Sequence, residues 1–155
     1  MKYKAKMWFL AMAVALVTMA AIPPAEARST TGWNAFRVWS SPLGANQCVA
    51  ESFGAAVNRC NFNINLTFEL VVDTPGWKHI AVWDAPGGNG AFTCAAANFS
   101  GVNNNIGVSD GKTFNPEGQE QLDFWIYVHP GDGLSLYCFN VPPGKGISNI
   151  NWDPA

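Results

Sequence analysis

The segment from Gln121 to His129 holds the residues with the clearest capacity for ligand chemistry. Trp125 and Tyr127 alternate with apolar residues, so in a strand they share one face with Asp123. Flat aromatic rings stack on the apolar faces of sugars, while carboxylates and amides hydrogen-bond to sugar hydroxyls. This pattern predicts a binding surface of rings and polar groups.

Asparagines alternate in the same way along the segment from Asn61 to Leu70. If that strand lies beside the one at 121–129, Asn63 and Asn65 flank the rings as polar partners. The predicted ligand-binding residues are Trp125, Tyr127, Asp123, Asn63 and Asn65. Among the six tryptophans of residues 28–155, Trp77 and Trp83 are alternative platform residues.

Two other interpretations of the rings stay open. Both sheet faces could be covered, with Trp125 and Tyr127 in a second core layer. An exposed aromatic face could instead bind a protein, because Trp and Tyr dominate such contacts. The hypotheses are therefore glycan binding, or an extracellular protein-interaction module such as an inhibitor, adhesin or envelope assembly component.

Two patterns could imitate a hydrolase. Gly107-Val108-Ser109-Asp110-Gly111 fits G-x-S-x-G, with Asp123 and His129 following in the order of a catalytic triad. A nucleophile elbow needs a strand before it and a helix after it, and neither is indicated here. A hairpin turn at 110–111 explains these residues better.

Glu117 and Glu120 could imitate the pair of acids of a glycosidase. Two acids three residues apart in a loop are better explained as part of a solvated face. We predict no catalytic residues, and a small secreted hydrolase is the least favoured function.

No metal or cofactor is predicted. His79 and His129 lie far apart in sequence, and the cysteines suit disulfides better than metal ligation. Asp84 and Asp132 lie in Gly-rich segments where calcium is conceivable, yet no ladder of aspartates supports it. Hydrogen bonding of each aspartate to nearby backbone is the simpler explanation.

Period-two alternation dominates the chain, and Gly-, Pro- and Asn-rich turns separate the alternating runs. This favours an all-β fold, a single-domain antiparallel β-sandwich with jelly-roll or Ig-like topology. Residues 48–57 are ambiguous, since 55–57 could form a helical turn, and 28–31 suit a loose leader. The expected strands are 35–40, 61–70, 79–84, 91–96, 121–129, 134–141 and 147–152.

Four cysteines follow residue 27, and they allow three pairings. Cys94 follows Pro86-Gly87, and Cys138 follows Pro130-Gly131, at the same distance. Both segments resemble hairpins with a cysteine on the return strand. We therefore predict the disulfides Cys48–Cys60 and Cys94–Cys138.

Residues 1–27 resemble a cleaved secretory signal peptide. Lys2, Lys4 and Lys6 precede an apolar run, which ends at Pro23-Pro24 before an A-x-A site at 25–27. We expect one mature domain at 28–155, secreted or periplasmic, with no membrane insertion. Residues 28–155 hold ten acidic and six basic residues, and the basic residues are not clustered in the sequence. This charge distribution argues against nucleic acid as a partner.

Overall fold

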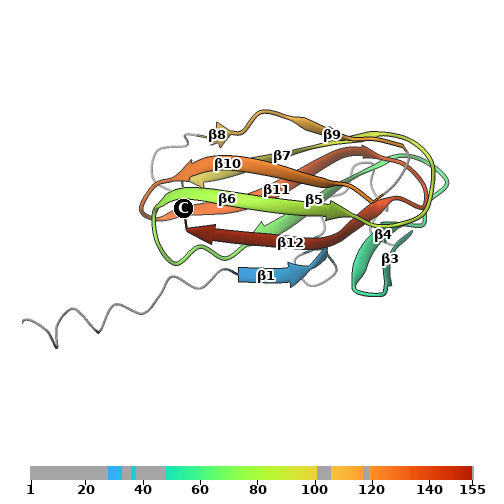
Figure 1. The fold of residues 1–155 in the computed structure, drawn as a ribbon, viewed down its shortest axis with the longest axis horizontal. Coiled ribbons are helices and arrows are strands. Elements are labelled where there is room, and N and C mark those ends of the chain that lie inside the picture. The colour runs from blue at the N-terminus through green and yellow to red at the C-terminus, as the bar shows by residue number, and fades with distance from the viewer. Residues whose placement is uncertain (1–27, 33–35, 38–47, 101–105, 117–118, 155) are drawn as a thin grey trace, which may run out of the picture.

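The computed structural model describes residues 28–32, 36–37, 48–100, 106–116 and 119–154. These residues form two six-stranded sheets packed face to face (Figure 1). Sheet A has the order β10-β6-β12-β4-β3, with β1 added beside β12. Sheet B has the order β2-β5-β11-β7-β8, with β9 also paired to β7. The predicted antiparallel β-sandwich is confirmed.

Every strand pairing in the described residues is antiparallel. The expected strands at 79–84, 91–96, 134–141 and 147–152 are present and extend further than predicted. The bounds are β1 Arg28–Thr31, β2 Phe36–Arg37, β3 Val49–Ser52, β4 Ala55–Asn58, β5 Ile64–Leu70, β6 Gly76–Asp84, β7 Phe92–Ser100, β8 Ile106–Val108, β9 Lys112–Phe114, β10 Gln121–Val128, β11 Asp132–Val141 and β12 Gly146–Pro154.

The core lies between the two sheets and follows the alternation of the sequence. In β10, Phe124, Ile126 and Val128 are buried, whereas Trp125 and Tyr127 are exposed. These residues belong to one hydrophobic core cluster, to which sheet B also contributes. Leu66 and Phe68 of β5 are fully buried in it. The period of two in the sequence therefore assigned the inner face of each of these strands correctly.

The predicted hairpins around the two Pro-Gly turns are wrong. β6 and β10 pair with each other in sheet A, while β7 and β11 pair in sheet B. Each Pro-Gly turn therefore carries the chain from one sheet to the other. The cysteine pairing is nevertheless confirmed, because Cys94 and Cys138 face each other in register on β7 and β11, fully buried.

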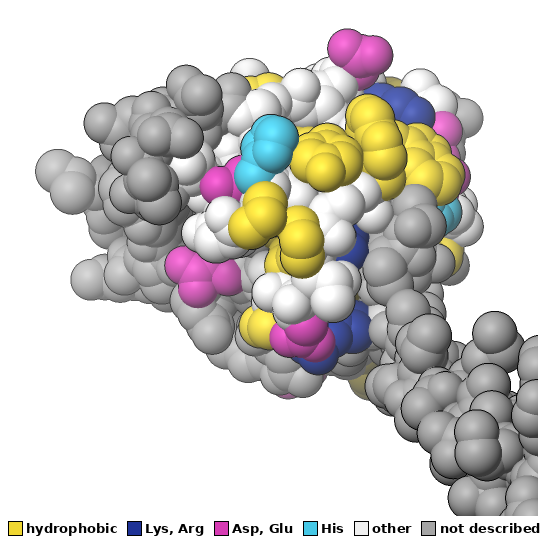
Figure 2. Space-filling model, turned by 90° about the vertical axis from the view of Figure 1, so that its left-hand side faces the viewer, with side chains coloured by type: hydrophobic (Ala, Val, Ile, Leu, Met, Phe, Trp, Pro, Cys, Tyr) yellow, Lys and Arg dark blue, Asp and Glu magenta, His cyan; other side chains and the backbone are white. Residues whose placement is uncertain are grey.

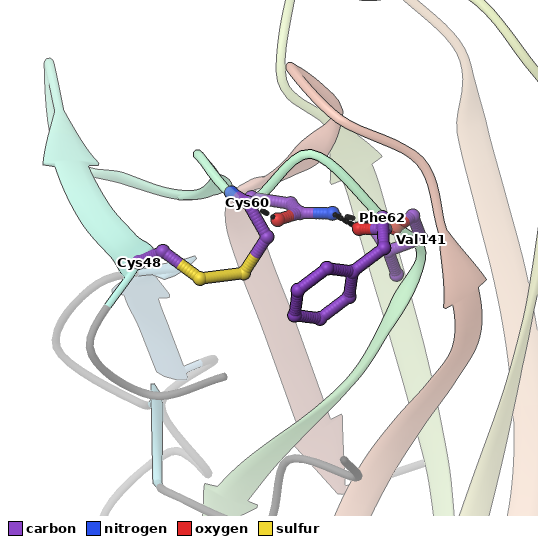
Figure 3. Close-up of a disulfide and its surroundings, with 5 residues drawn as sticks. Cys48, Cys60, Phe62 and Val141 are labelled. Carbon is purple, nitrogen blue, oxygen red and sulfur yellow. Dashed lines mark hydrogen bonds between the residues drawn. A yellow bond between two sulfur atoms is a disulfide. The ribbon is translucent and has the colours of Figure 1, made fainter. Parts of the chain in front are cut away.

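The second disulfide, Cys48–Cys60, is also confirmed and closes the β3–β4 hairpin (Figure 3). The buried side chain of Asn58 lies beside it. Its amide nitrogen donates to the carbonyl oxygens of Phe62 and Val141, both at 2.9 Å, and its oxygen accepts from the Cys60 N–H. One amide thus fixes the hairpin to the end of β11.

One ambiguous segment is resolved and two local predictions are corrected. Residues 55–58 form the strand β4 and not a helical turn, and residues 28–31 form β1, which pairs with β12. β8 and β9 do not form a hairpin with each other. Both pair with the edge of β7, so residues 109–111 only offset the chain between them.

A buried ion pair lies at one end of the sandwich, beside the loops 85–91 and 142–145. The Lys145 ammonium lies 3.2 Å from the Asp84 carboxylate, and both side chains are almost fully buried. Asp84 also accepts a hydrogen bond from the Glu120 N–H at 2.7 Å. The loops meet at Gly88 and Gly144, where a Cβ on either residue would lie within 3.0 Å of backbone of the other loop. Both glycines have positive φ, which glycine adopts without strain.

Within the described ranges, we find no helix with the length and apolar character needed to cross a bilayer.

Candidate functional site

The outer face of sheet A presents three adjacent columns of side chains. The period of two points Trp77, His79, Ala81 and Trp83 of β6 outward. Their register neighbours on β10 are Tyr127, Trp125, Asp123 and Gln121, in that order. On the other side of β6, β12 places Asn151 beside Ala81 and Asn149 beside Trp83.

Four rings of the first two columns form two contacting pairs. The imidazole of His79 stacks on Trp125, with ring centroids 4.7 Å apart and planes 26° apart. Trp77 and Tyr127 meet edge to face at 5.7 Å. Trp77, Trp125 and Tyr127 remain 56%, 55% and 42% exposed. We call Trp77, His79, Asp123, Trp125 and Tyr127 the β6–β10 face.

The β6–β10 face continues toward the loop end of the strands. Tyr127 contacts the ring of His129, with ring centroids 4.9 Å apart. Figure 2 looks onto the end of the sandwich where β6 begins and β10 ends, and it shows hydrophobic side chains gathered beside a histidine. Exposed rings in contact with one another form a larger apolar surface than scattered ones, which is typical of a binding site.

A carboxylate lies at one end of the rings. Oδ1 of Asp123 is 2.8 Å from Nε2 of His79 and accepts a hydrogen bond from the Gln121 amide at 2.9 Å. The Asp123 side chain is 42% exposed. Oδ2 has no hydrogen bond within the described residues. Asp123 therefore holds His79 against Trp125 and still offers one oxygen to a ligand.

The amides beside the rings differ from those predicted. The expected strand at 61–70 begins only at Ile64, as β5, and it lies in sheet B. Asn65 therefore belongs to the opposite sheet from Trp125, and Asn63 lies just before β5, outside the strand. Asn65 accepts a hydrogen bond from the Asn140 N–H at 3.0 Å. Gln121 of β10 and Asn149 and Asn151 of β12 take their place. Alternation predicts which way a side chain points and does not predict which sheet its strand joins.

Trp125, Tyr127 and Asp123 do share one exposed face, as the alternation predicted. The alternative in which both rings lie in a second core layer is wrong, because both remain open to solvent. Trp77, which the sequence offered as an alternative platform residue, belongs to the same face. His79 was not predicted as a site residue. It lies two residues after Trp77 on the same strand, and this spacing could have shown that both side chains point outward. Trp33 and Trp39 lie outside the described residues.

The catalytic candidates do not assemble into a triad. Asp123 contacts His79 and not His129, and the Ser109 hydroxyl accepts a hydrogen bond from the Ala96 N–H in sheet B. Glu120 accepts from the Asn115 N–H, which fixes a loop. Glu117 lies outside the described residues.

The calcium candidates have structural partners. Asp84 belongs to the buried ion pair with Lys145 and not to an exposed loop. Asp132 accepts hydrogen bonds from the His129 N–H and the Asn98 amide, which matches the backbone-bonding alternative. Among the described residues, no group of three His, Cys, Asp or Glu side chains could hold a metal ion.

Sheet B carries a second, separate group of rings on its outer face. Tyr137 lies between Phe99 and Phe139, with centroid distances of 5.8 and 6.4 Å. Burial raises the pKa of the Tyr137 hydroxyl, although a hydrogen bond with Ser135 opposes the shift. The Tyr137 side chain is therefore uncharged at neutral pH. Within the part of the chain that the structure describes, these three rings have no carboxylate paired with a histidine beside them. They therefore serve as a control for the β6–β10 face.

No family model matches the sequence, and no curated protein matches it. Solved structures with the same fold do exist. The chain is similar to the CBM22-1 xylan-binding domain of Xyn10C from Paenibacillus barcinonensis, with a TM-score of 0.54 and 12% identity over 87% of this chain and 99% of that one. It is also similar to a family 35 carbohydrate binding module from Clostridium thermocellum, with a TM-score of 0.52 and 8% identity over 84% and 100%.

A third similar structure is a longer protein, the GH26-CBM35 β-(1,4)-mannanase of Podospora anserina. The TM-score is 0.53 at 12% identity, and the match covers 83% of this chain but 28% of that one. At such identities the likeness establishes a shared fold, the β-sandwich of carbohydrate-binding modules. The ligand has to be argued from the side chains of this chain.

Proposed function

We propose that this protein is a non-enzymatic carbohydrate-binding domain and that the β6–β10 face is its binding surface. One observation carries the proposal: Trp77, Trp125 and Tyr127 are about half exposed, lie on paired strands and end at the carboxylate of Asp123. Leaving three such rings in water is unfavourable unless a partner covers them.

The proposed mechanism is stacking combined with hydrogen bonding. The C–H groups on the apolar face of a sugar pack on the electron-rich face of an aromatic ring. The Asp123 carboxylate accepts hydrogen bonds from the hydroxyl groups of the sugar, and the Gln121 amide can donate to them or accept from them. Strand geometry fixes the rings before the ligand arrives, so little side-chain entropy is lost on binding. The rings are about half exposed and lie on a sheet face at whose edge β10 runs, which suits a chain of sugars more than a single enclosed one.

The disulfides support a site of action outside the cytoplasm. All four cysteines of the described residues are paired, and such bonds persist in oxidising compartments. We propose that the domain is secreted or periplasmic, and that residues 1–27 direct its export and are then removed. Those residues lie outside the described part of the chain.

A glycan array tests the proposal with matched variants. Wild type should bind at least one class of neutral polysaccharide or cell-envelope glycan. Trp125→Ala and Trp77→Ala should each lower the affinity about tenfold, which corresponds to about 1.4 kcal/mol for one lost ring. Phe139→Ala, on the outer face of sheet B and 42% exposed, is the matched control and should leave binding unchanged.

Two results would overturn the proposal. Wild type could bind none of the glycans, including peptidoglycan, in which case the protein-interaction hypothesis becomes the better one. Alternatively, Phe139→Ala could abolish binding while Trp125→Ala preserved it, which would move the site to sheet B. Circular dichroism of each variant confirms that the substitution has left the fold intact.

A further inference from the structure

We infer that the β6–β10 face selects glycans that carry a free amine, of the glucosamine type, over N-acetylated and uronic acid glycans. This inference rests on the proposed function and concerns the charge of the ligand. The argument starts from the strand positions that point outward from sheet A.

The formal charge on this face is negative. In β6 the outward positions hold Trp77, His79, Ala81 and Trp83, and the only lysine of the strand, Lys78, points inward and is 3% exposed. The outward positions of β10 add one charged residue, Asp123. On β12, the outward positions Asn149 and Asn151 are uncharged. These outward positions of the three strands therefore include no lysine or arginine.

The rings themselves favour a cation. The π-face of tryptophan or tyrosine attracts an ammonium group that lies within about 6 Å of its centroid. Trp125 and Tyr127 alternate along β10, so their side chains lie about 7 Å apart along the strand. A sugar resting on either ring would place its substituents near Asp123 or near the neighbouring ring.

The carboxylate gives this preference a defined position. Oδ1 of Asp123 is occupied by His79 and Gln121, at 2.8 and 2.9 Å, which fixes the orientation of the group. Oδ2 is the remaining acceptor, and an ammonium donor binds it more strongly than a hydroxyl does, because the hydrogen bond is assisted by charge. A uronate at the same place would meet a like charge. An N-acetyl group would keep the ring contact and lose the charge.

The test compares three oligosaccharides of equal length by isothermal titration: a glucosamine oligomer with protonated amines, its N-acetylated form and a uronic acid oligomer. Wild type should bind the amine form about three- to tenfold more tightly than the N-acetylated form, and the uronate most weakly. Added salt should reduce this preference, since the Asp123 carboxylate is partly exposed to screening ions.

Asp123→Asn is the decisive variant. It should lower the affinity for the amine form more than that for the N-acetylated form, and so remove most of the preference. Asp110→Asn makes the same change in net charge at an exposed position outside sheet A, and should preserve the preference. Equal effects of the two variants, or tighter binding of the N-acetylated or uronate form by wild type, would overturn the inference. If wild type bound none of the three and no glycan on the array, the proposed function itself would fail.

Discussion

Lys145→Met should destabilise the protein by about 3–5 kcal/mol, because it leaves the carboxylate of Asp84 buried without its partner. The side chains of Lys145 and Asp84 are 2% and 0% exposed, so water cannot replace the lost ammonium. The Glu120 N–H would remain as one hydrogen-bond donor to the carboxylate. Urea unfolding followed by tryptophan fluorescence measures the loss.

The double variant Asp84→Asn with Lys145→Met separates the charge effect from the loss of packing. An asparagine at position 84 can still accept a hydrogen bond from the Glu120 N–H and carries no charge. The double variant should therefore recover more than half of the stability that Lys145→Met alone loses. Arg59→Met, at an exposed position, should change the stability by less than about 0.5 kcal/mol. A Lys145→Met protein as stable as wild type would show that the ion pair is not buried as described.

The second large effect concerns the disulfide within sheet B. Replacing Cys94 and Cys138 together by alanine should cost about 4 kcal/mol, since the bond closes a loop with a sequence separation of 44. Both cysteines are fully buried in the main core cluster, so the loss of their sulfur atoms adds a packing cost. Equilibrium unfolding in urea checks the value.

The matched control is the double alanine variant of Cys48 and Cys60. That bond closes a separation of only 12, and the same entropy relation gives about 3 kcal/mol. The Cys94–Cys138 variant should therefore lose more stability than the Cys48–Cys60 variant. A larger loss from the Cys48–Cys60 variant would contradict it, and peptide mapping by mass spectrometry establishes the pairing in the wild type.

The cysteine pairing was predictable for a reason that differs from the one first given. The equal distances from Pro86 to Cys94 and from Pro130 to Cys138 suggested two hairpins. Instead, each turn joins sheet A to sheet B, and the two return strands are neighbours. Equal distances from equivalent turns place the cysteines at the same depth in either arrangement. Local turn chemistry does not determine whether the chain returns in the same sheet.

The alternation of inward and outward residues along β6 also predicts a buried acid. Residues 78, 80, 82 and 84 share the inward face of β6, so Asp84 was predictable as a buried acid that needs a partner. Its partner Lys145 lies on a distant turn, and no local signal connects the two. The same alternation places His79 beside Trp77, on the outward face.

The composition of the candidate site was predictable only within single strands. Asp123, Trp125 and Tyr127 alternate on one strand, and they share a face in the structure. The residues from other strands depend on which strands become neighbours. That choice follows from long-range packing of the whole core, so Asn149 and Asn151 were not foreseen, and the strand of Asn65 does not neighbour that of Trp125.

The most direct measurement of the central claim is a titration followed by ¹H–¹⁵N nuclear magnetic resonance, with an oligosaccharide that the array identifies. The indole N–H signals of Trp77 and Trp125 should shift as the ligand is added. The Trp152 indole is the internal control, because it is 8% exposed and donates to the Val71 carbonyl oxygen at 2.8 Å. Shifts confined to Tyr137 and Phe139 of sheet B, with Trp77 and Trp125 unchanged, would contradict the account.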